Sequence, residues 1–317
     1  MSRSQAGTAL AVGLRFPESP LWCPDGSVVV VEIESGRVVS AREGAIKVVA
    51  ECGGGPNAVA FGPDGALYVA NNGGLSFREV PARGWLFPGD RATDWLGGSV
   101  QRVDPASGAV TVLYDAFQGR QLRAPCDLVF DGTGGFWFTD HGHSYGEIRE
   151  WGCVYYARAD GSSLTQVLPR MDTPNGIGLA PDGTTLYVAE TNPARLWAFA
   201  LSEPGVLDPV RHGAHRQPRY GGRVLHGMGG YHLFDSLAVD AHGNVNVATM
   251  GEHTGIAVVS PDGGLLTFVD VDDPAVTNLC FGGPGLRTAF ITLSASGRVV
   301  ALDWPRPGLQ LAHQEYA

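Results

Sequence analysis

The sequence predicts an all-β protein, a six-bladed β-propeller, and three observations lead to this expectation. Glycine and proline, 45 and 21 of the 317 residues, recur between short apolar runs, as in proteins built from many short strands joined by turns. A strand–turn–strand pattern repeats six times along the chain. The repeats mostly begin with a polar residue, where strand propensity favours an apolar one.

The repeat unit is clearest in TPNGIGLAPDGTTLYVAET at residues 173–191, where two apolar strands flank a Pro-Asp-Gly turn. In every copy a glycine falls eight residues after the first residue, and a more polar pair of strands follows. Four short strands per unit, repeated radially, describe a propeller blade. The first residues of the six copies are Glu18, Asn57, Cys126, Asn175, Asp235 and Thr277.

We therefore expect residues 1–317 to form a single propeller domain, with inner strands beginning near 18, 57, 126, 175, 235 and 277. The stretch ALAVGLRF before Glu18 is expected to pair with the last blade and close the ring, because an open radial sheet would leave an exposed edge. Residues 72–98 and 204–231 are longer than blade connections need. They are predicted loop insertions that act as lids or pack over blade edges.

Composition excludes several classes of function. The net charge is −10 and the basic residues are scattered, so neither a nucleic-acid surface nor a polybasic membrane patch is expected. This charge pattern fits a small-molecule partner instead. The amino terminus lacks a signal-peptide pattern and a membrane-spanning stretch, which predicts a cytoplasmic protein. Five cysteines without CxxC spacing argue against a disulfide framework, and no phosphate-binding glycine motif, GxSxG or HExxH occurs. The sequence leaves the oligomeric state open.

The polar first residues are expected to converge at one mouth of the central channel. Two carboxylates, Glu18 and Asp235, and two carboxamides, Asn57 and Asn175, form an oxygen donor set suited to calcium, magnesium or manganese. The same side chains could instead only hydrogen-bond water in a wet channel. A ring of this kind explains why polar residues begin otherwise apolar strands.

Several motifs resemble one known family along nearly the whole chain. They are FPESPLW at 16–22, LRAPCDLVFDGTGGFWFTD at 122–140, TPNGIGLAPDGTTLYVAET at 173–191, DSLAVDAHGNVNVAT from 235 and VTNLCFGG at 276–283. In order and in register, they resemble the senescence marker protein (regucalcin), gluconolactonase and luciferin-regenerating enzyme-like family. The family is more distantly similar to paraoxonase and diisopropyl fluorophosphatase.

The resemblance implies a six-bladed propeller holding one divalent cation, usually calcium, although zinc and others serve in the family. It implies that Glu18, Asn175 and Asp235 are metal ligands, and it places Cys126 where the family has a ligand asparagine. The typical activity is hydrolysis of sugar lactones or other cyclic esters. In that chemistry the cation polarises the carbonyl, and Asp235 is the expected base that assists water.

Cys126 leaves several interpretations open. A thiolate favours zinc, iron or copper over calcium, so the metal preference is shifted, one coordination place is left to water, or no metal binds; manganese is another candidate ion. Asp127 is expected to point to the other side of the strand, whereas Asn57 could compensate from blade two. A nucleophilic role for Cys126 is also conceivable.

Histidines and loop side chains complete the predicted site. His141 and His143, in FTDHGHSYG, are candidate catalytic residues because strand-end loops reach the channel mouth. The predicted substrate-binding residues are Asn57, Cys126, Arg78, Trp85, Tyr145 and His232. Aromatic rings in the first insertion suit a less polar substrate than a bare sugar lactone.

The sequence thus predicts an enzyme, a metal-dependent hydrolase of the lactonase type. One alternative is that the same pocket catalyses another ester hydrolysis, an isomerisation or a cyclisation. Another is a non-catalytic propeller that binds a ligand or a partner protein, since the fold alone does not decide the activity.

Overall fold

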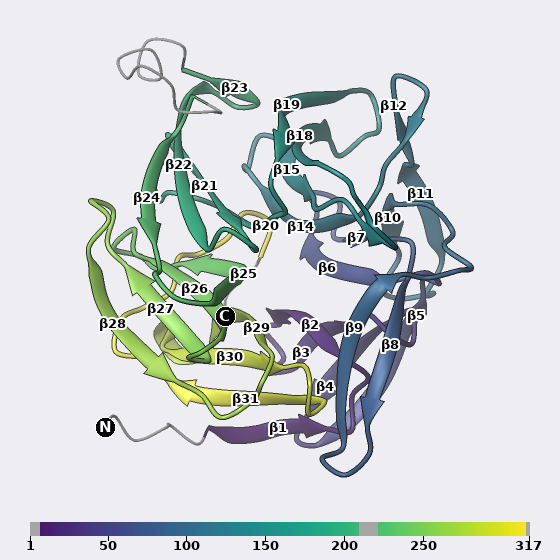
Figure 1. Ribbon diagram of the computed structural model, residues 1–317, viewed down its shortest axis with the longest axis vertical. Coiled ribbons are helices and arrows are strands. Elements are labelled where there is room, and N and C mark those ends of the chain that lie inside the picture. Colours follow the sequence, from purple (N-terminus) through teal and green to yellow (C-terminus); the bar gives the residue numbers. More distant parts are fainter. Residues whose placement is uncertain (1–6, 209–220, 315–317) are drawn as a thin grey trace.

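The protein is a six-bladed β-propeller, which confirms the predicted fold class (Figure 1). The structure is a computed structural model that describes residues 7–208 and 221–314. Six antiparallel sheets surround a central axis, five of them with four strands and one with five. The described residues contain no helix long and apolar enough to cross a membrane.

The blades follow the sequence repeats in order, each counted from its inner strand outward. Blade one contains β2 (Pro17–Trp22), β3 (Val28–Glu32), β4 (Arg37–Arg42) and β5 (Ala45–Glu51). Blade two contains β6 (Pro56–Phe61), β7 (Leu67–Asn71), β10 (Ser99–Val103) and β11 (Val110–Tyr114). Blade three contains β14 (Pro125–Phe130), β15 (Gly135–Asp140), β18 (Gly152–Arg158) and β19 (Leu164–Met171).

The second half continues the same arrangement. Blade four contains β20 (Pro174–Leu179), β21 (Thr185–Glu190), β22 (Arg195–Glu203) and, both paired with β22, β23 (Val206–Leu207) and β24 (Arg223–Gly227). Blade five contains β25 (His232–Val239), β26 (Val245–Gly251), β27 (Gly255–Val259) and β28 (Leu265–Asp270). Blade six contains β29 (Val276–Gly282), β30 (Thr288–Leu293), β31 (Arg298–Asp303) and β1 (Thr8–Val12).

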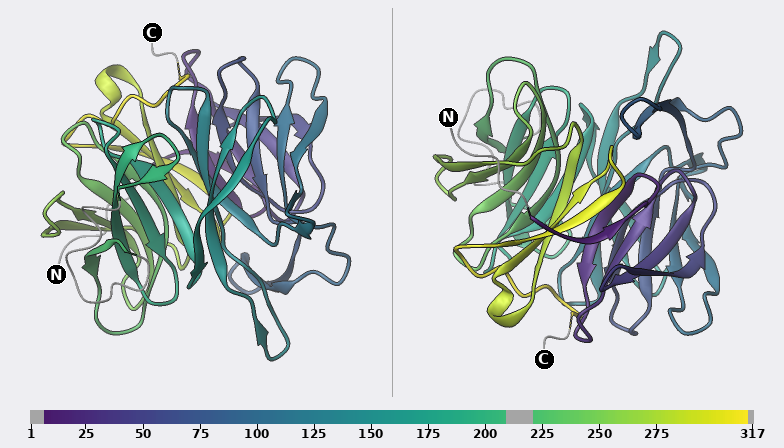
Figure 2. Two further views of the ribbon diagram at one scale, coloured as in Figure 1. Left: turned by 90° about the horizontal axis from the view of Figure 1, so that it is seen from above. Right: turned by 90° about the horizontal axis from the view of Figure 1, so that it is seen from below.

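The ring closes through the amino-terminal strand, as the sequence predicts. β1 pairs antiparallel with β31, and Thr8 lies opposite Ala301. In the right-hand view of Figure 2 the purple β1 runs beside the yellow strands of blade six. The inner strands also pack against one another around the axis, with β2 in contact with both β6 and β29. Pairing the first strand with the last blade leaves no open radial edge.

Packing between neighbouring blades forms the core. Each of the six blade interfaces holds one cluster of buried apolar side chains. Between blades two and three, for example, Tyr68 lies edge-on to Phe130 with ring centroids 5.1 Å apart, and Phe136 is fully buried. All five cysteines are free, and Cys153 and Cys280 are buried in such clusters. The absence of a disulfide agrees with the cysteine spacing.

Every inner strand is irregular near its start. The pairing register shifts between Glu18 and Leu21 in β2, between Pro125 and Leu128 in β14, and at the corresponding place in the other four blades. A β-bulge interrupts the strict alternation of side chains and bends the strand. Two successive residues of an inner strand can therefore both face the channel.

The first predicted insertion is a β-hairpin, β8 (Leu75–Val80) and β9 (Trp85–Arg91), that reaches from blade two toward blades one and six (Figure 1). The backbone N–H of Leu86 donates to Ala295 O at 2.9 Å. Leu86 also packs against Phe16 and Ala275. The insertion is thus an ordered element laid over the neighbouring blades.

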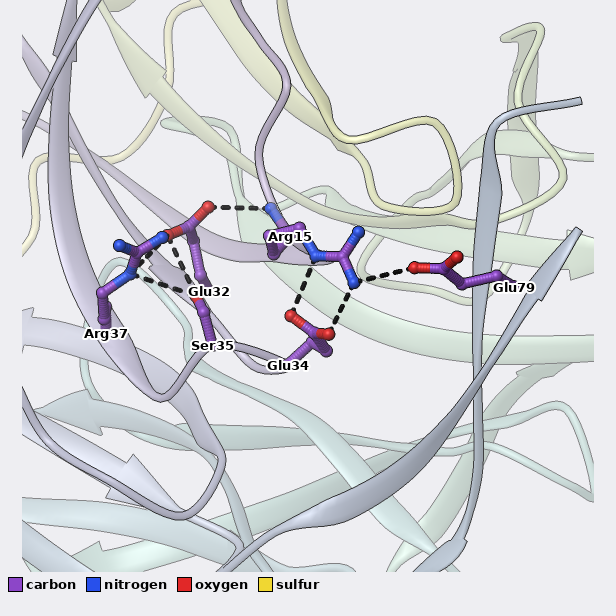
Figure 3. Close-up of polar contacts among 6 residues, drawn as sticks. All are labelled: Arg15, Glu32, Glu34, Ser35, Arg37 and Glu79. Atoms are coloured by element: carbon purple, nitrogen blue, oxygen red, sulfur yellow. Dashed lines mark hydrogen bonds and ion pairs between the residues drawn. The ribbon is translucent and has the colours of Figure 1, made fainter. Parts of the chain in front are cut away.

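A charge network ties the same hairpin to blade one (Figure 3). The Arg15 guanidinium donates to Glu34 at 2.5 and 2.9 Å and to Glu79 of β8 at 3.0 Å. The hydrogen bond to Arg15 lowers the pKa of Glu34. Beside it, Arg37 donates to the buried Glu32 at 2.8 Å. Arg15 is therefore the polar anchor of the hairpin.

The second predicted insertion is partly a blade element. Within residues 204–231, β24 forms an outer strand of blade four, so this part is not an added loop. Its sequence RVLHG is short and lacks a clear alternation of apolar and polar residues. The strand therefore cannot be recognised from the sequence pattern. Residues 209–220 of the predicted insertion lie outside the described residues.

Candidate functional site

Four of the predicted ring residues form one chain of polar contacts across blades two to five. Asn57 Nδ2 donates to Cys126 Sγ at 3.3 Å, and the Cys126 thiol donates to Asn175 Oδ1 at 3.3 Å. Asn175 Nδ2 donates in turn to Asp235 Oδ1 at 2.6 Å. Each side chain lies at the bulge of an inner strand, so the fold brings together residues up to 178 positions apart, from 57 to 235. Cys126 and Asn175 are buried, whereas Asn57 and Asp235 are partly exposed.

Glu18 reaches the channel from blade one. Its Oε2 accepts from Asn278 Nδ2 at 2.7 Å and from the backbone N–H of Ser19. Asp235 is near enough to contribute to the raised pKa of Glu18. Thr277 does not join the polar contacts of the ring, because its hydroxyl bonds those of Thr292 and Ser294 inside blade six. Blade six contributes Asn278 instead.

The carboxyl groups of the ring have raised pKa values. Burial, and then the Asp235 carboxylate, raise the pKa of Glu18 well above its ordinary value. Burial raises the pKa of Asp235 to about 7. Burial and then Asp235 also raise the pKa of the Cys126 thiol, so the sulfur is held as a neutral donor. A carboxylate at Asp235 that makes ionisation of the buried Glu18 less favourable also favours a bound proton or cation at this place.

Asp127 faces the channel as well, contrary to the alternation expected at Cys126. The bulge in β14 turns both residues inward, and Asp127 accepts from the backbone N–H groups of Leu128 at 2.8 Å and Ile177 at 3.2 Å. Burial raises its pKa to about 7. Asp127 thus adds a third carboxyl group beneath the ring.

A cavity of about 1280 Å³ occupies the half of the channel beyond this layer. Asp127 and Asn278 lie among its lining residues, and its walls are mainly apolar, including Ile177, Leu237 and Leu279. None of the four linked ring residues lines it. The polar ring and the apolar half of the channel are therefore separate environments, divided by Asp127 and Asn278.

The donor set fits a hard divalent cation better than a soft one. Among the described residues no group of three or more His, Cys, Asp or Glu side chains is arranged to hold a metal. The carboxylates of Glu18 and Asp235 and the Asn175 carboxamide supply oxygen donors, which suit calcium or magnesium. One such ion would offset the charge of Asp235 that disfavours ionisation of Glu18.

Asn72 connects the ring to the rim of the channel. It follows β7, is buried, and donates from Nδ2 to Asn57 Oδ1 at 3.0 Å. Its carbonyl oxygen accepts from Trp95 Nε1 at 2.8 Å and from His143 Nε2 at 3.0 Å. Because a carbonyl only accepts, His143 carries its proton on Nε2. The sequence places Asn72 only at the start of an insertion and gives no sign of this role.

The two candidate catalytic histidines lie just after blade three's second strand. His143 is buried, and its ring meets Trp95 edge-on at 5.7 Å. His141 is partly exposed, and its Nδ1 donates to Gly142 O at 3.0 Å. Burial lowers the pKa of His141 to about 4 and also lowers that of His143. Both imidazoles are therefore neutral near pH 7.

The other predicted substrate-binding residues lie in different places. Tyr145, in the short strand β16 (Ser144–Tyr145), stacks on the guanidinium of Arg91 with 4.0 Å from Cζ to ring centroid. Trp85 packs in the cluster beneath the β8–β9 hairpin, and Arg78 is exposed over Phe87. None of the described polar contacts links Trp85 or Arg78 to the ring.

His232 lies three residues before Asp235. It is buried, its Nδ1 donates to Gly229 O at 2.7 Å, and its ring stacks on His253 at 5.7 Å. Its Nε2 has no hydrogen-bond partner among the described residues. The contacts of His232 are therefore with blade five's own loops.

A family model described as the SMP-30/Gluconolactonase/LRE-like region matches residues 16–295. A gluconolactonase of Zymomonas mobilis is 27% identical over 289 residues, covering 88% of this chain and 70% of that protein. Lactonase drp35 of Staphylococcus aureus is 35% identical over 127 residues, 40% of this chain and 36% of drp35. The crystal structure of regucalcin from Agrobacterium tumefaciens, a calcium-binding protein, superposes with a TM-score of 0.72 at 17% identity, covering 98% of this chain and 97% of that one.

Proposed function

This chain belongs to the SMP-30/gluconolactonase/LRE-like family, and on that premise we propose that it is a lactonase-type hydrolase that opens a cyclic ester. The observation that carries the proposal is the set of Glu18, Asn175 and Asp235 at one position of the channel, in a chain similar to a gluconolactonase and to a lactonase. Its partner is then a small-molecule substrate.

Glu18, Asn175 and Asp235 would hold one divalent cation, with calcium the best match to three oxygen donors. When bound, such an ion polarises an ester carbonyl and stabilises the negative charge that develops on its oxygen. Cys126 takes the place of a fourth ligand, and its neutral thiol, hydrogen-bonded to Asn175, orients that carboxamide. Ligation of a softer ion such as zinc by Cys126 would require the thiol to lose its proton.

Asp235 is the residue that accepts the proton of the attacking water. Asn175 fixes its Oδ1 at 2.6 Å, while the partial exposure of the residue lets water approach the carboxylate. The water oxygen bonds to the acyl carbon, and the bond from that carbon to the ring oxygen breaks. Asp235 returns the proton it has taken to the ring oxygen, which leaves as a hydroxyl group. The second proton of the water is released as the new carboxylic acid ionises.

The histidines act from the rim. His141 is neutral at pH 7 and uses Nδ1 on Gly142, so its Nε2 is the atom available to accept from a substrate hydroxyl. His143 donates a hydrogen bond from Nε2 to the carbonyl oxygen of Asn72 and packs against Trp95, so it holds both residues in place. We therefore assign His141 to substrate contact and His143 to positioning.

The test is proton release in a pH-stat on sugar, aliphatic and aryl lactones. The protein is first stripped with chelator and then given calcium, manganese or zinc one at a time. We expect turnover that requires an added ion and falls at least about 100-fold in Asp235→Asn. Asp303→Asn, an exposed carboxylate on β31, is the matched control and should retain activity. A folded protein that opens no lactone with any ion would overturn the proposal and favour a non-catalytic binding propeller.

A further inference from the structure

An arginine at the rim of the channel is held between two aromatic rings. Arg91 ends β9 and pairs with Leu75 at the base of the hairpin. Its guanidinium carbon lies 4.9 Å from the Trp95 ring centroid and 4.0 Å from the Tyr145 ring centroid. Stacking on ring faces leaves the N–H donors of a guanidinium free at its edge, where they match the two oxygens of a carboxylate.

The rings that hold Arg91 are themselves fixed to the site. Trp95 Nε1 donates to Asn72 O at 2.8 Å, and Asn72 Nδ2 donates to Asn57 of the ring at 3.0 Å. Gly73 makes room for this indole, since a Cβ there would lie 2.3 Å from Trp95 Nε1. Arg91 is thus connected to the ring through two intervening residues, Trp95 and Asn72, on the side of blades two and three.

Arg91 is not neutralised by the protein. In the part of the chain that the structure describes, no carboxylate or other side-chain acceptor bonds its guanidinium. The nearby Glu150 is occupied elsewhere: it accepts from the backbone N–H of His143 at 3.2 Å and lies 3.7 Å from Arg123 Nε. Arg91 is therefore a stacked cation without an acidic side-chain partner at the rim of the channel. Such a cation is arranged to bind the anionic group of a ligand.

We propose that Arg91 binds a carboxylate of the substrate, so that the protein acts on lactones that carry a negative charge. This inference rests on the proposed lactonase function and names its substrate class. The ester group of such a substrate lies over Glu18, Asn175 and Asp235, while its carboxylate reaches Arg91 at the rim. Hydrolysis then yields a hydroxy acid with two carboxylates and one released proton.

The first experiment compares two lactones of the same ring size. 5-Oxotetrahydrofuran-2-carboxylate carries a carboxylate where γ-valerolactone carries a methyl group. We expect the ratio of their kcat/KM values to fall about 10- to 100-fold in Arg91→Gln, the range for a lost charge-assisted hydrogen bond, with the change mainly in KM. Arg91→Lys, which keeps the charge without the planar fork, should recover part of the ratio.

A matched control separates recognition from hairpin structure. Arg83 also stacks on a tryptophan of the hairpin, 5.4 Å from the Trp85 centroid, but it is exposed at the turn. Arg83→Gln should therefore keep the wild-type ratio. An equal ratio in wild type and Arg91→Gln, with both lactones turned over, would overturn the proposal.

Binding distinguishes failure of this inference from failure of the lactonase function. If neither lactone is hydrolysed, calorimetric titration with tetrahydrofuran-2-carboxylate in chelator tests Arg91 alone. At least tenfold weaker binding in Arg91→Gln, but not in Arg83→Gln, would support carboxylate recognition without the proposed activity. No binding to the wild type, or equal binding to all three proteins, would refute it.

Discussion

Acid should destabilise this protein partly through His141. Burial lowers the pKa of its imidazole to about 4, whereas the unfolded chain keeps it near 6.5. Between these values the unfolded state binds a proton that the folded state does not, so the stability present above pH 6.5 is lost as the pH falls toward 4. Integrated from pH 7 to pH 5, this one side chain removes about 1 to 2 kcal/mol from the free energy of unfolding.

Urea unfolding at pH 5, 6 and 7 measures the effect in wild type, His141→Gln and His242→Gln. The loss of stability from pH 7 to pH 5 should shrink by about 1 to 2 kcal/mol in His141→Gln. His242 is exposed, and its replacement should leave the pH dependence as it is in wild type. The same pH dependence in wild type and His141→Gln would show that folding does not lower the pKa of His141, as would an NMR titration of His141 with a midpoint near 6.5.

Three further substitutions test the packing, the hairpin anchor and the ring. Gly176→Ala would place a Cβ 2.7 Å from the backbone N of Leu237, so it should lower the free energy of unfolding by about 1 to 3 kcal/mol. Gly178→Ala meets methyl groups that can shift and should cost less in the same thermal melts, so equal losses would count against the blade spacing. Arg15→Ala should lower stability by less than about 1 kcal/mol but speed limited proteolysis within the β8–β9 hairpin, unlike Arg83→Ala. Cys126→Asn should raise calcium affinity relative to zinc in competition titrations, and an unchanged preference would mean that this position does not contact the ion.

The fold could be predicted because its signal is local and repeated. Each copy contains an inner strand, a turn and a second strand within fewer than twenty residues, as in 173–191, and the six copies agree in register. The closing role of β1 followed from the need to cover an edge strand. The outer strand β24 was not predicted because it is short and is separated from β23 by residues 208–222 of the sequence. The β8–β9 hairpin was predicted only as a long loop.

The site could be predicted less completely, because several of its residues depend on geometry that no local pattern encodes. Glu18, Asn175 and Asp235 can be recognised in the sequence because they are polar residues at the starts of otherwise apolar strands. Asp127 was expected to face away, since alternation predicts that neighbours point to opposite sides, but the bulge in β14 turns it inward. Asn278 follows Thr277, the first residue of its repeat, as Asp127 follows Cys126. A bulge in β29 lets Asn278 reach Glu18.

Asn72 and Arg91 show a second limit of sequence reasoning. Each acts through partners from other blades: Asn72 binds His143, which is 71 positions away, and Arg91 stacks on Tyr145. The position of a residue in a long insertion indicates only that the residue can reach the mouth of the channel. The pairing of β8 with β9, and the packing of β9 against β16, decide which of its arginines lies beside Trp95 and Tyr145.

We propose that Glu18, Asn175 and Asp235 form one cation site that serves lactone opening. The most direct measurement is anomalous diffraction from crystals soaked in calcium and, separately, in manganese, with the metal content of the dissolved protein determined in parallel. We expect one ion per chain within about 2.1 to 2.6 Å of an oxygen of each of the three residues, and its loss in Asp235→Asn. A fully folded protein with no ion there, or with its ion bound elsewhere, would contradict it.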